Sequence, residues 1–147
     1  MTDKLNHQTA ALRVCVDRAQ AGRVSGTVYS RRLRRPMPFA DMGSLLLQVD
    51  AVLDAQNFPQ AFQRSRTFQE KGTRSPSAYA ADSREEGLTE ETVEEARGEI
   101  ATFLLSVITR RSSSWQGQVD WLDGAPVGMF SSALELIKLV DDRLFGG

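Results

Sequence analysis

The clearest pattern of apolar and polar positions lies near the end of the chain. Between residues 117 and 122, Gly, Val and Trp alternate with Gln, Asp and Leu, which is typical of a half-buried strand. The next dipeptide is Asp123-Gly124, which favours a two-residue hairpin because both central residues of a type I′ turn need positive φ. Residues 125–130 are predicted to return as a second strand, and Pro126 makes that strand weak or places it at an edge.

A capped amphipathic helix is predicted directly after this strand. Ser132 and Glu135 have the spacing of a capping box, in which the two side chains accept hydrogen bonds from free amides at the helix start. Apolar residues then follow at helical spacing, at Ala133, Ile137, Val140 and Leu144. Gly146 marks the expected end of the helix.

The same pattern occurs earlier in the chain, at a constant offset of 91 positions and without a gap. When residues 11–54 are placed over 102–145, the helix stripe matches and Asp41 takes the cap position of Ser132. Outside the apolar positions of the helix, the identical pairs are Val16 and Val107, Gly26 and Gly117, Val28 and Val119, Phe39 and Phe130, and Asp50 and Asp141. We interpret this match as an internal duplication.

The duplication predicts an α+β fold, in which two pseudo-symmetric β-β-β-α repeats form one antiparallel sheet with two helices packed on one face. Residues 1–147 form a single domain, with repeat one at 11–57, a linker with an acidic helix at 58–100, and repeat two at 101–147. The weakest strand of each repeat is the third. The other expected elements are strands at 12–17, 26–33 and 103–109, a helix at about 42–55 and the acidic helix at about 90–99.

The repeats also carry a resemblance. The segment SSWQGQVDW…FSSALELIKLVDDRL resembles the signature SWQGxVxW…FxSxLEL of a family of short uncharacterised bacterial proteins. The segment GTVYSRRLRRPMPFADMGSLLLQVD is similar to a companion pattern of the same family, and the resemblance leaves out the N-terminus and residues 69–100. It implies family membership, but it carries over no activity and no catalytic residue.

Composition and charge narrow the class of protein. The chain is 41% hydrophobic and 25% charged, which is ordinary for a globular domain, and its formal net charge of −1 argues against general polyanion binding. The single Cys15 excludes an internal disulfide, suits a reducing compartment and is expected to be a buried structural thiol. Without a signal peptide or a long apolar run, we expect a cytoplasmic protein with no membrane contact.

Candidate chemistry is scarce. His7 is the only histidine and lies in a polar N-terminal stretch, so Ser-His-Asp and Cys-His arrangements are disfavoured. No Cys/His cluster has metal-ligand spacing, and no glycine-rich phosphate loop is present. We therefore predict a protein that is not an enzyme and that has no catalytic residue, metal site or cofactor.

Arginines and aromatic residues form the candidate binding site, which consists of Tyr29, Arg31, Arg32, Arg34, Arg35, Arg110, Arg111 and Trp115. They predict a protein-interaction or regulatory module that binds a protein partner through the sheet face or an open edge and an Arg-rich hairpin. The alternative is a nucleic-acid-binding regulator that uses the same arginines. Arginines at a hairpin rim can also pair with the acidic residues 82–99, and Trp115 suits the core as well as an interface. A monomer and a homodimer are both left open.

Overall fold

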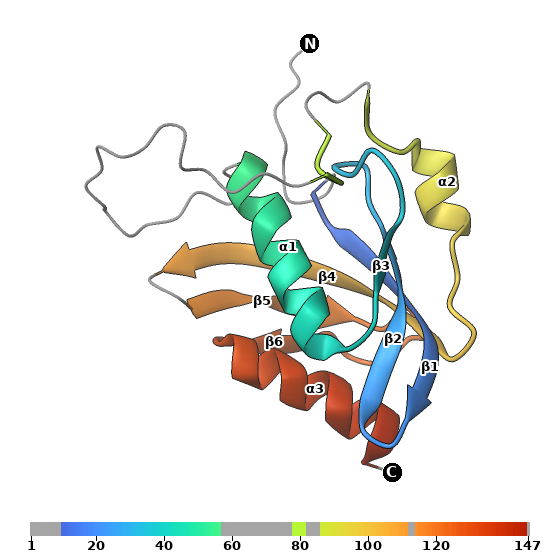
Figure 1. Cartoon of the computed structure of the whole chain (residues 1–147). Helices are drawn as coiled ribbons and strands as arrows, with labels where there is room; N and C mark the ends of the chain where they lie inside the picture. Colours follow the sequence, from blue (N-terminus) through green and yellow to red (C-terminus); the bar gives the residue numbers. More distant parts are fainter. Residues whose placement is uncertain (1–9, 57–77, 82–85, 112–113, 147) are drawn as a thin grey trace.

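The computed structural model confirms the α+β class, with one antiparallel sheet. It describes residues 10–56, 78–81, 86–111 and 114–146. The strands are β1 (Leu12–Gln20), β2 (Arg23–Tyr29), β3 (Met37–Phe39), β4 (Ala101–Arg111), β5 (Ser114–Asp120) and β6 (Gly128–Phe130). The helices of this part of the chain are α1 (Met42–Gln56), α2 (Glu90–Glu95) and α3 (Ala133–Phe145). The order across the sheet is β3-β2-β1-β4-β5-β6, so the short third strands are the edges (Figure 1).

The register of the sheet is centred on the pairing of β1 with β4, where Arg13 lies opposite Leu104. In the flanking pairs, Val16 lies opposite Gly26 and Val107 lies opposite Gly117. Each ladder shifts register directly after that valine, between Val16 and Arg18 and between Val107 and Thr109. Such a shift bends the strand and increases its local twist.

One hydrophobic cluster joins the sheet to α1 and α3. Alternate residues of the two central strands enter it, namely Leu12, Val14, Val16, Phe103, Leu105 and Val107. The helices contribute Leu45, Val49, Val52, Leu53, Leu136 and Val140. Figure 1 shows α1 crossing in front of β4 and β5 and α3 running beside β6, whereas α2 lies to one side of the sheet.

Both predicted helix caps are confirmed. The side chain of Asp41 accepts a hydrogen bond from the Ser44 N–H at 2.7 Å, and that of Ser132 accepts one from the Glu135 N–H at 3.1 Å. The Glu135 carboxylate in turn accepts from the Ser131 N–H at 2.7 Å. These bonds satisfy amides that have no partner within a helix, so each long helix starts where its sequence signal lies.

The predicted two-residue turn at Asp123-Gly124 is wrong. The connection between β5 and β6 runs from residue 121 to 127, where the carboxylates of Asp120 and Asp123 each accept a hydrogen bond from the amide two residues on. These bonds shape a longer loop in place of a type I′ turn. A two-residue turn with positive φ at both centres occurs instead between β1 and β2, at Ala21 (φ 54°) and Gly22 (φ 77°).

The predicted acidic helix at 90–99 is correct in type but ends early, at Glu95. Ala96 has extended backbone angles, and its carbonyl accepts a hydrogen bond from the Arg13 side chain at 2.8 Å. The chain then runs along β1, where the Ile100 N–H donates to the Val16 carbonyl at 2.8 Å. Contacts with the sheet therefore replace the last helical turn.

Cys15 is buried, at 2% exposure, as predicted. Burial raises the pKa of its thiol from an ordinary 9.0 to about 11, although the Arg13 guanidinium acts in the opposite direction. The resulting stabilisation is complete below about pH 9 and is lost as the pH rises towards 11, because the unfolded thiol ionises first. We expect the free energy of unfolding to fall more steeply over this range in the wild type than in Cys15→Ala, measured by urea denaturation. Parallel curves would contradict this expectation.

Candidate functional site

The Arg-rich turn, Arg31–Arg35, connects β2 to β3 and is covered by a segment distant in sequence. Leu33 forms an isolated bridge with Ala80, and the Leu33 carbonyl also accepts a hydrogen bond from the Leu88 N–H at 2.8 Å. The Arg34 N–H donates to Tyr79 at 2.8 Å, and the Arg32 carbonyl accepts from Ala81 at 3.0 Å. Backbone hydrogen bonds thus hold residues 79–81 and 88 against the turn.

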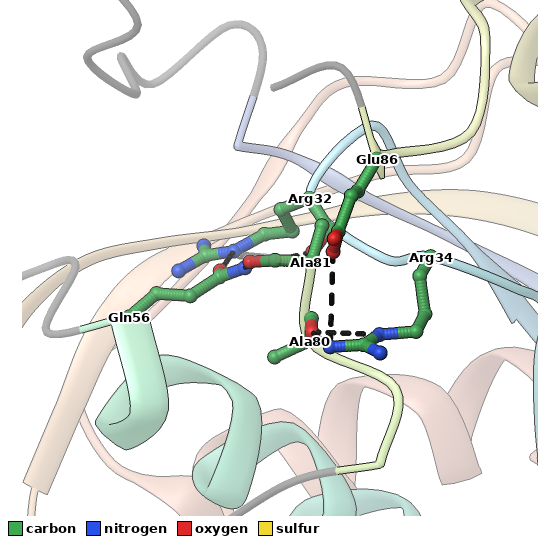
Figure 2. A network of polar contacts seen from close by, with 6 residues as sticks. All are labelled: Arg32, Arg34, Gln56, Ala80, Ala81 and Glu86. Atoms are coloured by element: carbon green, nitrogen blue, oxygen red, sulfur yellow. Dashed lines mark hydrogen bonds and ion pairs between the residues drawn. The ribbon is translucent and has the colours of Figure 1, made fainter. Parts of the chain in front are cut away.

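Arg32 is an internal part of this arrangement, with only 3% of its surface exposed. Its Nε donates to the Gln56 side chain at 2.7 Å, and one terminal nitrogen donates to the Ala10 carbonyl at 3.3 Å. The Gln56 amide donates to the carbonyls of Arg32 and Ala81 at 2.8 and 2.9 Å (Figure 2). Arg32 and Gln56 therefore tie the end of α1 to the turn and to the segment that covers it.

Arg34 has a similar role nearer to the surface. Two of its nitrogens donate to the Ala80 carbonyl, at 3.1 and 3.0 Å, and one lies 3.8 Å from the Glu86 carboxylate (Figure 2). This fork on a single carbonyl uses the planar donor geometry that lysine lacks. Arg34 therefore donates hydrogen bonds to the segment that covers the turn.

The other two arginines of the turn lie at the rim. Arg31 forms an ion pair with Glu90 at 3.7 Å, in which both side chains are substantially exposed. The Arg35 guanidinium lies 4.9 Å from the centre of the Tyr79 ring. The predicted contact between the acidic segment and the arginines is confirmed at Glu86 and Glu90. Exposed pairs of this kind are weak, and they are readily exchanged for other carboxylates.

The remaining predicted site residues are not gathered at this turn. Tyr29 is half-buried in β2, opposite Arg13. Trp115 is only 7% exposed and belongs to the hydrophobic cluster, so it is a core residue and not a surface anchor. Arg110 and Arg111 lie in β4, and their side chains are outside the described part of the chain. The strand order separates β5 from β2 by two strands.

The two edges of the sheet differ in a way that the sequence prediction missed. At the β3 edge the middle residue is Pro38, which has no N–H, and its carbonyl accepts a hydrogen bond from the Gln48 side chain at 2.8 Å. At the β6 edge the middle residue is Met129, which is 65% exposed. At the offset of 91 positions Gln48 matches Leu139, and leucine has no side-chain donor. The sequence did contain a signal for this difference, because Pro38 matches Met129 at the offset of 91 positions.

Within the described residues, no three His, Cys, Asp or Glu side chains are grouped so that they could hold a metal ion. His7 lies outside that part of the chain. No helix among the described residues has the length and hydropathy needed to cross a bilayer. Comparison of the chain with protein-family models, curated proteins and solved structures finds no significant match.

Proposed function

We propose that this protein is a non-enzymatic interaction module that adds an extended segment of a partner protein to the β6 edge. The observation that carries this proposal is the difference between the two edges. Pro38 and Gln48 leave β3 without a free donor or acceptor at its centre, whereas Met129 keeps both its N–H and its carbonyl. An open edge of this kind is a template for strand addition.

The direction of the free groups follows from the register. Thr27 lies opposite Pro38, whose carbonyl points away from β2 towards Gln48. Gln118 lies opposite Met129 in the same register, so we infer that the N–H and carbonyl of Met129 also point away from the sheet. Apart from the ladder with β5, no hydrogen bond of Met129 to another described residue is found. Two main-chain groups are therefore available to an incoming strand.

The chemistry of the partner follows from the side chains around this edge. Val127, Met129 and Leu134 are 42%, 65% and 67% exposed, which suits apolar side chains on the incoming segment. The neighbouring α3 carries Glu135, Asp141 and Asp142 against Lys138 and Arg143. A second copy would bring the same excess of carboxylates to the edge, so an apolar segment with basic flanks fits better.

We also infer that the fold is a duplicated β-β-β-α unit with a pseudo-twofold axis and with α1 and α3 on one face. The registers support this inference. Arg13 lies opposite Leu104, the residue that matches it at the offset of 91 positions, as expected where a twofold axis passes between β1 and β4. The ladders on either side pair equivalent residues and shift register at equivalent valines. In a duplicated unit, the change from Pro38 to Met129 opens one edge and leaves the other closed.

A nucleic-acid-binding function has less support. Arg32 and Arg34 donate to carbonyls and a side chain of their own chain, which leaves Arg31 and Arg35 at the rim of the turn. Two rim arginines beside Glu86 and Glu90 form a weaker phosphate surface than the five-residue basic run suggests. In the proposed function, the Arg-rich turn mainly stabilises the fold.

Met129→Pro tests the proposal, because it gives β6 the block that β3 already has. A protein retained from native lysate by the wild type, in the presence of nuclease, is expected to be lost from Met129→Pro and kept by Met129→Val. The purified partner segment should then bind the wild type at least about tenfold more tightly than Met129→Pro, since two main-chain hydrogen bonds are affected. Binding of the partner segment should also slow amide exchange at Met129 of the wild type. The melting temperatures of Met129→Pro and Met129→Val should equal that of the wild type. Equal retention by Met129→Pro, or retention only without nuclease, would refute strand addition.

A further inference from the structure

A cavity of about 540 Å³ has no residue of the Arg-rich turn or of β6 in its lining. Three arginines from distant parts of the chain line it: Arg13 of β1, Arg97 after α2, and Arg143 of α3. The loop after β5 contributes Trp121 and Asp123. The lining thus contains three cationic side chains and one carboxylate.

Arg13 is the most informative of these side chains, because it is only 9% exposed. Its Nε donates to the Ala96 carbonyl at 2.8 Å. No other hydrogen bond or ion pair of its guanidinium is found with any described residue. Buried donors without partners are costly, and a buried charge is normally paired. Because Arg13 lines the cavity, an acceptor bound there would pair with its terminal N–H groups.

Arg97 adds a second positive charge close to the first. Burial lowers the pKa of Arg13, and the charge of Arg97 lowers it further, whereas Glu94 acts in the opposite direction. The hydrogen bonds of Arg97 are long, at 3.4 and 3.5 Å, and go to the carbonyls of Glu94 and Ala96. An anion between the two guanidinium groups would replace their repulsion with two attractions.

The charge of Arg143 is already balanced. It forms an ion pair with Asp123, and its guanidinium lies 4.7 Å from the centre of the Trp121 ring. A hydrogen bond from the Ala125 N–H and the pairing with Arg143 lower the pKa of Asp123, so this carboxylate is ionised at neutral pH. Neither Arg13 nor Arg97 forms an ion pair with a described residue, and two such charges match a dianion better than a single carboxylate.

We propose that this cavity binds the phosphate group of a small phosphate monoester. The guanidinium groups of Arg13 and Arg97 hold the phosphate oxygens. Thr102 lines the same cavity, and its hydroxyl, which accepts a hydrogen bond from the Gly98 N–H at 2.9 Å, retains an O–H donor. Ile100 and Leu122 are 54% and 43% exposed at its boundary, where they contact an apolar or aromatic ester group. Nothing in this site depends on the β6 edge or its partner.

Calorimetric titration of the full chain with phenyl phosphate, inorganic phosphate and benzoate tests the proposal. Phenyl phosphate is expected to bind saturably in the millimolar range or below, because an aligned pair of guanidinium groups meets a dianion. Inorganic phosphate is expected to bind more weakly, since it lacks the apolar group, and benzoate at least about tenfold more weakly, since it carries one charge. Absence of saturable binding, or equal binding of benzoate, would overturn the phosphate site. Equal binding of inorganic phosphate would overturn the role of the apolar boundary.

Two charge-matched variants separate a built site from general attraction. Arg97→Gln removes an exposed cavity arginine and is expected to weaken phenyl phosphate binding about tenfold. Arg18→Gln removes one positive charge from an exposed position of β1 outside the cavity, and its affinity should stay within about twofold of the wild type. Similar losses in both variants would show non-specific attraction only. The test does not require substitution of Arg13, whose burial makes it important for folding.

Discussion

Gly117→Ala is expected to abolish stable folding of this protein. A Cβ atom at this position would overlap the backbone carbonyl of Ser106 in the neighbouring strand β4 and would also press on the Phe130 ring. The obstacle is main chain in the middle of the sheet, next to the register shift at Val107, so no side-chain rotation can relieve it. We expect a loss of at least about 4 kcal/mol, which is a large part of the stability of an ordinary domain.

Gly26 and Gly43 provide the comparison. Gly26→Ala is expected to have an equally large effect, because its Cβ atom would overlap the Cys15 carbonyl in the other half of the sheet. Gly43 lies near the start of α1, and a Cβ atom there would be 3.4 Å from the Asp41 carboxylate, which is an ordinary contact. Gly43→Ala is therefore expected to be neutral or to stabilise the protein by up to about 1 kcal/mol. Urea denaturation followed by circular dichroism measures all three. A Gly117→Ala protein with near wild-type stability would show that β4 and β5 do not approach in this way.

Arg32→Met is expected to destabilise the protein by about 3 kcal/mol, because it removes charged hydrogen bonds from a buried network. The Gln56 side-chain oxygen and the Ala10 carbonyl would lose their donor. Arg32→Lys is expected to recover only part of this loss, since an ammonium group cannot reproduce the planar fork. Residues 79–81 should also exchange their amides faster in both variants.

The matched control for this network is Arg35→Met. Arg35 is exposed and contacts the Tyr79 ring, and contacts of this kind at exposed sites contribute at most about 1 kcal/mol. Urea midpoints of the three variants and the wild type give the comparison. Equal stability of Arg32→Met and Arg35→Met would contradict this expectation. It would mean that Arg32 behaves as a surface arginine like Arg35 and that its hydrogen bonds with Gln56 do not stabilise the fold.

Local signals in the sequence predicted most of the elements correctly. The caps at Asp41 and Ser132 begin the long helices, and the predicted weak strand at 125–130 forms the short edge strand β6, from Gly128 to Phe130. These features depend on residues close in sequence, whose hydrogen bonds form within one helix or one hairpin. The turn at Asp123-Gly124 failed because neighbouring carboxylates bond to the loop backbone, an alternative that a dipeptide preference does not include.

The candidate site was predictable only in part, because it depends on contacts between distant residues. The run Arg31–Arg35 is visible in the sequence, but its five side chains differ in burial and in their contacts. Arg32 and Arg34 donate hydrogen bonds to Gln56 and to the segment 79–81. No residue close to the turn in the sequence indicates these partners. The cavity arginines, Arg13, Arg97 and Arg143, are even more widely separated, so the sequence alone shows no cluster.

By itself, the sequence determined the kinds of elements and their order, and it matched Gly26 with Gly117 as strand glycines. Periodicity and caps suffice for this, because they act over one or two turns of chain. Only the tertiary structure decided that Arg32 and Arg34 bond to Gln56 and Ala80, that Trp115 is buried, and that the Pro38 carbonyl at the β3 edge is bonded to Gln48 while Met129 at the β6 edge is exposed. Burial, pairing and free hydrogen-bonding groups are set by which distant segments meet, and that depends on how the whole sheet is assembled.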